Sequence, residues 1–541
     1  MSEAAVEKGT TSLGERVKRV LPWLLFALAL WEPLQYLHLT FLEFSSGDEG
    51  VLLAGALRIL HGQVPYRDFF FFVAPGSLYL IAGWLRLFGT TLVAARWLAW
   101  LVNGVMLLGL ALLGKALNLS RASLAVLFLS QVAVGFVVWP IVSHHWMVNA
   151  ALFLSAACLA LSDRGERRGL LFASGALAGA GGLMLQDEGG YWVLLVILLL
   201  LLSGGERRWK KIGLFVGGGL VVAGPIVVTL LAKVPASQIL DDLLWAPLRL
   251  YHDNPGNRVG WGQGWSATFR ALPAVWRTGD AWTLANDLGQ GVGMAVVFLV
   301  FPVAVALTLL RSARLRRLSE EERWPWLVLL CMTGALVLMA LHRPTVMTLI
   351  FAFPGAFLLI LWEWERVRKC QPRWFSRLTG AGLMLPLAIT VATTSLPYPY
   401  LAPRSSFDFP SGKLTTEVAQ SKPSWELLYQ FQKRFLQPGQ SVFCYDYCSF
   451  YSFVLRRVGA TPYDNFDMGR FDPAMVHDLL AHLAAKPPDW ILLDGRYGPD
   501  PGDPVVGWVS LHYRPLARCT GLLIVGRADM AVKPAAHPER R

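Results

Sequence analysis

Long apolar runs separated by short polar segments dominate the first 396 residues of the chain. Most runs approach the roughly 20 residues that a helix needs to cross the apolar core of a membrane. The pattern predicts about eleven membrane-spanning helices: Leu21–Thr40, Thr91–Leu113, Ala122–Trp139, Trp146–Leu161, Gly169–Leu185, Tyr191–Leu202, Ile212–Leu231, Val292–Leu310, Trp324–Leu341, Val346–Trp362 and Leu378–Leu396.

Lysine and arginine collect in short clusters between these runs, as they do in the cytoplasmic loops of membrane proteins. If every cluster is cytoplasmic, an even number of crossings must separate any two of them. Residues 1–20 then form a cytoplasmic N-terminal tail. Val73–Phe88 becomes an interfacial or re-entrant helix, because counting it as a span would send every later cluster outside. We therefore expect a multi-pass protein of the cell (inner or plasma) membrane.

The pattern changes after Leu396. Short alternating runs predict strands at SVFCYDY, DWILLDG and CTGLLIVGR, and helices at SFYSFVLRRVG and DPAMVHDLLAHLAAK. Residues 397–541 are numerous enough to bury a core of their own. The predicted fold class is thus an α-helical polytopic membrane protein with a small extracytoplasmic α/β domain at its C-terminus. Whether Cys444 and Cys448 of that domain form a disulfide stays open.

Composition agrees with a membrane protein. Hydrophobic residues make up 54% of the chain and charged residues 16%, and the mean hydropathy is +0.45. The net charge of +12 is spread over clusters between apolar runs, so we predict no nucleic-acid partner. The chain has no GxxxxGK[ST], GxSxG or HExxH motif, which argues against ATP-driven transport.

The loop at residues 41–90 carries the most distinctive chemistry. The adjacent acids Asp48 and Glu49 lie just past an apolar run and precede an amphipathic segment, Val51–Leu60. Carboxylates so close to a bilayer are costly. Two explanations are open: the acids stabilise the N-terminus of a helix, or they belong to a site. The prolines and aromatic residues that follow predict a loop that holds its position.

The acidic pair, the amphipathic segment, HGQVPYRDF and PGSLYL together resemble the first extracytoplasmic loop of C-type (GT-C) integral-membrane glycosyltransferases. Protein O-mannosyltransferases and lipid A aminoarabinose transferases are related enzymes. The close resemblance covers Leu21–Leu117. It implies a GT-C-like transmembrane domain over residues 21–396 and a polyprenyl-phosphate sugar as donor. It also implies that Asp48 is a general base and that Glu49 supports it.

Further polar residues are predicted on the same side of the membrane as Asp48. Asp187 and Glu188 end a span rich in glycine and alanine, where the alternative is a pair of helix-end acids facing water. His144 and His145 are helix neighbours that point about 100° apart, so they cannot both bind one metal in simple helical geometry. The family often has a second acid near this point, and WPIVSHHWMVN has none. A divalent metal is left open, and no other cofactor is indicated.

The remaining candidates would bind substrate. The guanidinium group of Arg343 is permanently charged, and its N–H groups can donate two hydrogen bonds to one phosphate. His342 is its neighbour in the sequence. Arg249, in the long predicted loop Ala232–Gly291, could also bind phosphate. Tyr66 and Asp68 complete the set, which is Tyr66, Asp68, His144, His145, Asp187, Glu188, Arg249, His342 and Arg343.

We predict an inverting glycosyltransferase that moves a sugar from a polyprenyl-phosphate donor to an extracytoplasmic acceptor, which is a lipid, a glycan or a protein. The alternative is a secondary transporter or lipid flippase. Transporters place charges near the membrane midplane on broken helices, whereas here they cluster at one face. A catalytically silent scaffold whose outer domain binds a partner is a third reading.

Overall fold

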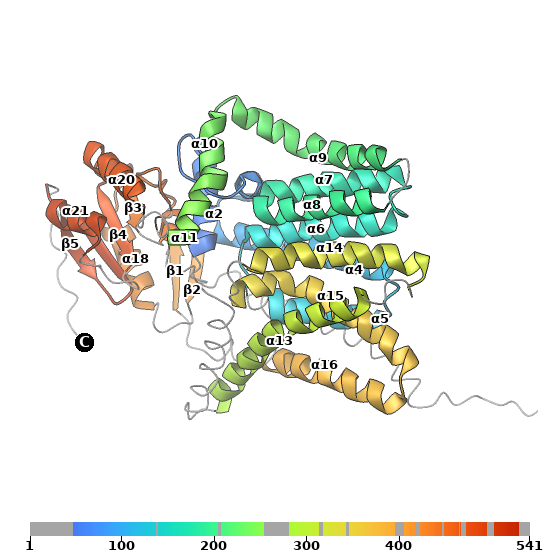
Figure 1. Cartoon of the computed structure of the whole chain (residues 1–541). Helices are drawn as coiled ribbons and strands as arrows, with labels where there is room; N and C mark the ends of the chain where they lie inside the picture. The colour runs from blue at the N-terminus through green and yellow to red at the C-terminus, as the bar shows by residue number, and fades with distance from the viewer. Residues whose placement is uncertain are drawn as a thin grey trace, which may run out of the picture.

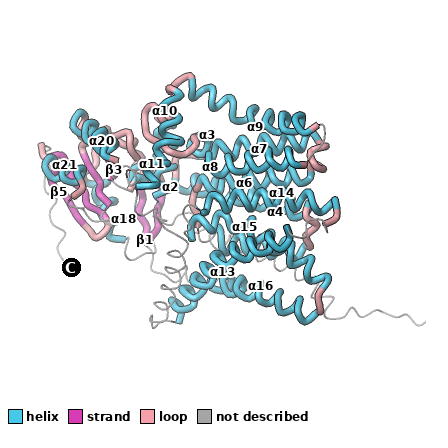
Figure 2. Tube along the Cα trace, viewed as in Figure 1, coloured by secondary structure: helices cyan, strands magenta, loops and turns pink. Residues whose placement is uncertain are grey.

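A helix bundle and a smaller domain that contains a sheet make up the molecule (Figure 1; Figure 2). The computed structural model describes residues 47–136, 139–203, 207–253, 281–312, 318–341, 346–394, 405–416, 422–445, 448–464, 466, 472–494 and 502–529. Figure 1 shows α2 and the C-terminal domain at the same end of the bundle.

Every predicted span within the described residues coincides with a helix. The helices are α4 (Leu92–Ala116), α5 (Arg121–Ser130) continuing into the π-helix η2 (Gln131–Phe136), α6 (His144–Leu161), α7 (Arg168–Met184), α8 (Gln186–Leu202), α9 (Arg208–Leu231), α13 (Ala281–Ser312), α14 (Glu320–Leu341), α15 (Val346–Cys370) and α16 (Arg373–Thr394). Five of them contain a segment long and apolar enough to cross a membrane. The total of eleven stays a prediction, since Leu21–Thr40 lies outside the described residues.

Small residues let α7 and α9 pack closely, as the sequence predicts. A Cβ atom on Gly175 would overlap the Phe215 carbonyl group, and one on Gly179 would come within 2.5 Å of the Gly219 carbonyl oxygen. Close backbone approach of this kind is the usual way in which membrane helices associate. The glycine-rich span thus fixes the position of the α7–α8 turn, which carries Asp187 and Glu188.

The first loop begins with α2 (Gly47–Leu60) and ends with α3 (Gly76–Phe88). The 13 residues of α3 span only about 20 Å, which is less than the roughly 30 Å of a bilayer core. Its length agrees with the interfacial or re-entrant placement of Val73–Phe88. Gly89, with a φ of 95°, ends the helix in a conformation that favours glycine.

The C-terminal domain contains a four-stranded sheet in the order β3-β4-β6-β5. Strand β3 (Val442–Tyr445) is parallel to β4 (Trp490–Asp494), whereas β6 (Leu522–Arg527) is antiparallel to β4 and to β5 (Tyr513–Arg518). A separate hairpin pairs β1 (Ser405–Phe409) with β2 (Gly412–Thr416). The helices of the domain are α18 (Lys422–Arg434), α19 (Ser449–Val454), α20 (Pro473–Ala485) and α21 (Pro504–His512).

The two faces of this sheet join different cores because side chains alternate along a strand. Trp490 and Leu492 of β4 belong to the apolar core that also contains the membrane helices. Ile491 and Leu493 point the other way, into a second core with Leu479 of α20. One face of the sheet is therefore buried together with the helix bundle.

These elements confirm the predicted fold class of a helical bundle with apolar helices and a small C-terminal α/β domain, whereas the side of the membrane on which that domain lies stays a prediction. Strands predicted at SVFCYDY, DWILLDG and CTGLLIVGR are β3, β4 and β6, and the two predicted helices are α19 and α20. The hairpin, α18, α21 and β5 were not predicted. Cys444 and Cys448 are free thiols; the Cys444 sulfur accepts from Ser452 at 3.2 Å, and the Cys448 thiol donates to carbonyl oxygens.

Candidate active site

The two acids of the first loop have different surroundings, although they are neighbours in the first turn of α2. Asp48 is exposed and Glu49 is fully buried. Arg96 of α4 donates to both oxygens of Glu49, at 2.6 Å each, and the Val142 N–H donates to Oε1 at 3.1 Å. Glu49 thus ties α2 to α4 and to the segment before α6, and this leaves Asp48 on the open side of the turn.

Two histidines begin α6, where the Ser143 hydroxyl accepts from the His145 N–H at 3.2 Å and caps the helix. The rings of His144 and His145 lie 4.4 Å apart, and the His145 ring stacks on Phe351 at 4.4 Å. The Nδ1 atom of His145 is 3.5 Å from the Glu188 carboxylate. Stacking and the carboxylate together fix the orientation of the His145 ring.

The acids that begin α8 also differ from one another. Asp187 accepts from the N–H of the next residue, Glu188, at 2.7 Å, and its negative charge lies in the first turn of α8, where such a charge is favourable. The Glu188 side chain is fully buried, and neither of its oxygens accepts a hydrogen bond within the described part of the chain. A buried carboxylate without such a bond is costly, which marks this position as more than a helix end.

Charge interactions connect these three helix starts. The charges of Asp48 and Asp187 both act on His144 and on His145. The structure therefore brings Asp48, His144, His145, Asp187 and Glu188 together from α2, α6 and α8; the predicted membrane topology stays a prediction. Their catalytic and substrate-binding roles stay predictions.

A metal finds no ready set of ligands here. Among the residues that the structure describes, no group of three or more His, Cys, Asp or Glu side chains is arranged to hold a metal ion.

Other predicted site residues hold the first loop in shape. The hydroxyl of Tyr66, which is buried, donates to the Val73 carbonyl oxygen at 2.8 Å, and burial raises the pKa of this phenol well above 10. Asp68 accepts from the Val64 N–H at 2.7 Å and from Arg67, whose hydrogen bonds lower the pKa of Asp68. Their binding of substrate stays a prediction.

The basic candidates contribute less to this geometry. Arg249 is exposed and pairs with Asp241 at 3.3 Å. His342 and Arg343 lie outside the described residues. The phosphate-binding part of the prediction therefore has no structural description.

Sequence reasoning missed several residues that shape the site. Arg96 could have been found from the sequence, because an arginine within an apolar span needs a partner of opposite charge. Gln186 accepts from the Ala74 N–H at 2.9 Å and donates to the carbonyl oxygens of Phe72 and Leu243, at 2.9 and 3.1 Å. It thereby joins the first loop to the π-helix η3 (Asp241–Trp245).

A third buried acid, Asp242, lies in η3. Its charge acts on Tyr66 and on Tyr463. Burial, together with the neighbouring Asp241, raises the pKa of Asp242 from 3.8 to about 7. This carboxyl group therefore titrates near neutral pH, unlike an exposed aspartate.

Comparison with known proteins identifies one matching family model. It is described as dolichyl-phosphate-mannose-protein mannosyltransferase and matches residues 73–231, from the first loop to the end of α9. The match confirms the resemblance to membrane glycosyltransferases for that part of the chain. No curated protein matches the sequence.

Solved structures similar to most of the chain include two of ArnT from Cupriavidus metallidurans, one bound to undecaprenyl phosphate and one in the apo state. Each is 14% identical, with a TM-score of 0.48. The alignments cover 96% and 94% of this chain, and 99% and 98% of those chains, respectively.

Proposed function

We propose that this protein is an inverting membrane glycosyltransferase that transfers a sugar from a polyprenyl-phosphate donor to a hydroxyl group outside the cytoplasm. The observation that carries the proposal is the cluster of polar residues at the starts of α2, α6 and α8. Glu49, the neighbour of Asp48, accepts from the Val142 N–H just before α6 at 3.1 Å, and His145 of α6 lies 3.5 Å from the Glu188 carboxylate of α8. Residues from α6 and α8 belong to the segment that matches the mannosyltransferase family model, whose name includes a polyprenyl-phosphate sugar.

In this reaction Asp48 takes the proton of the acceptor hydroxyl group. The acceptor oxygen then attacks the anomeric carbon, and the bond from that carbon to the phosphate oxygen breaks. The polyprenyl phosphate leaves with the bonding electron pair, and the configuration inverts because attack and departure occur on opposite faces. Asp48 suits the role of base because it is exposed beside a polar cluster, whereas both oxygens of Glu49 are engaged by Arg96.

The departing phosphate gains negative charge and needs a cation. Arg343, with His342 beside it, is our candidate, since a guanidinium can donate two parallel hydrogen bonds to a phosphate. Glu49 acts as a positioning residue in this scheme, because its contacts to α4 and to Val142 fix the turn that carries Asp48. His145 of α6 and Glu188 of α8 would orient the substrate.

The position of the acids supports an enzyme over a transporter. A transporter is expected to hold its charges near the midplane, on interrupted helices. The acids of this cluster lie in the first turns of α2 and α8 instead.

The direct test is transfer by detergent-purified protein supplied with polyprenyl-phosphate sugars, polyprenyl-phosphate mannose among them, with products followed by mass spectrometry. We expect these donors to support transfer and UDP- or GDP-sugars to be inert. Asp48→Asn should lower turnover by at least the ~10²-fold typical of a lost general base. A folded Asp48→Asn protein that keeps near-normal transfer would mean that the base is misassigned.

A further inference from the structure

The helix that carries Asp48 packs directly on the C-terminal domain. Helix α19 lies against α2, and a Cβ atom on Gly50 would come within 2.6 Å of the Phe450 backbone nitrogen and 3.0 Å of its Cα. Only a glycine permits this approach without a shift of one backbone. Gly50 is two residues from Asp48, so the C-terminal domain touches α2 in the turn that holds the proposed base.

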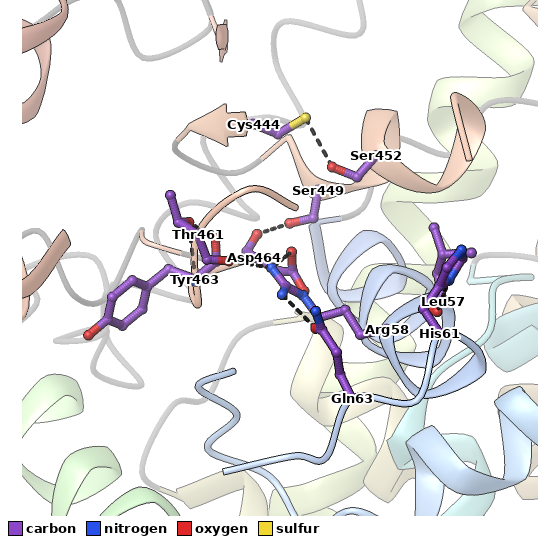
Figure 3. A network of polar contacts seen from close by, with 10 residues as sticks. All are labelled: Leu57, Arg58, His61, Gln63, Cys444, Ser449, Ser452, Thr461, Tyr463 and Asp464. Atoms are coloured by element: carbon purple, nitrogen blue, oxygen red, sulfur yellow. Dashed lines mark hydrogen bonds and ion pairs between the residues drawn. The ribbon is translucent and has the colours of Figure 1, made fainter. Parts of the chain in front are cut away.

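A buried polar network holds the other end of α2 (Figure 3). Arg58 donates through Nε and Nη2 to the two carboxylate oxygens of Asp464, at 2.5 and 2.9 Å, and through Nη2 to the Thr461 carbonyl oxygen at 2.5 Å. Its Nη1 donates to the side-chain oxygen of Gln63 at 2.9 Å. The exposed fractions of the Arg58 and Asp464 side chains are 2% and 6%. The Ser449 hydroxyl of α19 donates to the Asp464 carbonyl oxygen, which joins the network to the helix that meets Gly50.

Backbone contacts extend the interface along the loop. The Phe70 N–H donates to the Pro462 carbonyl oxygen at 3.0 Å. Arg456 donates to the Thr90 carbonyl oxygen at 2.7 and 3.1 Å, and the Leu92 N–H, which begins α4, donates to Ser411 at 3.1 Å. The C-terminal domain therefore contacts the first loop at its start, its middle and its end.

We propose that the C-terminal domain is a positioning element of the active site, which holds α2 between the Gly50–Phe450 contact and the Arg58–Asp464 pair. The proposal rests on the proposed function, in which Asp48 of α2 is the base. Arg58, Asp464, Gly50 and Phe450 are then positioning residues that touch no substrate. A buried ion pair whose partners come from two parts of the chain specifies one relative placement, because any shift leaves a charge unpaired in an apolar core.

The first experiment uses Asp464→Asn, which keeps the size of the side chain and removes its charge. We expect turnover to fall at least tenfold with an unchanged donor KM, because the geometry of the base is disturbed and the donor site is not. Backbone hydrogen exchange, read by mass spectrometry on the full-length protein, should quicken at least tenfold in peptides of residues 47–60. Asp529→Asn breaks an exposed pair in the same domain and is the matched control, with neither change expected.

The second experiment perturbs the other end of α2 with Gly50→Ala. We expect the same loss of turnover and the same local increase in exchange, because the new methyl group must separate α2 from α19. Gly83→Ala in α3 is the control, since a Cβ atom there meets nothing within 4 Å. If Asp464→Asn fails to extract as a folded protein, Gly50→Ala still decides the question.

The outcomes separate this proposal from the proposed function. Unchanged exchange in residues 47–60 and unchanged turnover in both Asp464→Asn and Gly50→Ala would overturn the positioning role. Increased exchange with full turnover would also overturn it, since α2 would then be held for no catalytic purpose. An active Asp48→Asn protein would instead refute the assignment of the base, whatever the exchange data show.

Discussion

Replacing Glu49 with Gln should separate the structural role of this acid from the catalytic role of its neighbour. Arg96 and Glu49 side chains are 1% and 0% exposed, and two hydrogen bonds of 2.6 Å join them. Glu49→Gln keeps one oxygen that can accept from the Val142 N–H, but it leaves the Arg96 charge buried without its counterion. Breaking a buried pair from one side costs about 3–5 kcal/mol.

The partner change supplies the control. Arg96→Met should cost a similar amount, because it leaves the Glu49 carboxylate alone in an apolar core. The double variant removes both charges and should be more stable than the sum of the two single losses predicts, with a coupling of at least about 1 kcal/mol. Asp48→Asn should cost less stability than either single change of the buried pair, since the Asp48 side chain is exposed and solvent screens its charge.

Stability can be followed by titrating purified protein in mild detergent with SDS and recording tryptophan fluorescence, and transfer can be measured on the same samples. We expect Glu49→Gln to lose stability and to lose less turnover than Asp48→Asn. The reasoning fails if Glu49→Gln is as stable as the parent, or if the two single effects add without coupling in the double variant.

Three further predictions concern pH, the donor and topology. The folded-state pKa of Asp242 is raised from 3.8 to about 7, so its contribution to stability is present at low pH and is lost as pH rises through this interval; Asp242→Asn should raise the thermal midpoint more at pH 8 than at pH 5, and an equal rise at both would refute the shift. Arg343→Ala should weaken donor use by about 1.5–3 kcal/mol, measured as donor KM or affinity, and unchanged affinity would remove Arg343 from the site. A tag on Arg541 should resist protease in intact cells and be digested once the outer barrier is opened, whereas a cytoplasmic tag would break the rule that basic clusters share one side.

The hydrophobic pattern was sufficient to locate the described helices of the bundle, because a helix that crosses the apolar core of a membrane needs a long uninterrupted apolar run. It also placed Asp48, His144 and Asp187 at helix ends that meet. It could not identify partners: nothing near Arg58 in the sequence indicates a carboxylate 406 residues away. An arginine within an apolar span, such as Arg96, predicts a buried counterion, but the sequence does not show that this counterion is Glu49.

The elements missed in the C-terminal domain have local causes. Strand β5 reads YRPLAR, and its proline breaks the alternation expected of a strand; Pro515 is tolerated because β5 is an edge strand, with a register shift between Pro515 and Ala517. Helix α18 has a proline at its second residue and only three buried apolar side chains, Trp425, Leu428 and Phe431, so its hydrophobic pattern is weak.

The distance in sequence between Arg58 and Asp464 has a consequence for how the protein is made. At roughly 5–20 residues per second, a ribosome needs about 20–80 s to add the 406 residues between them. Throughout that time α2 exists without its buried partner, and the turn with Asp48 lacks the support of α19. A chain that stopped between residues 394 and 464 would contain the described helices of the bundle but lack the carboxylate that pairs with Arg58. Under the proposal above, α2 would be held in place only after the C-terminal domain had been synthesised and had folded onto it.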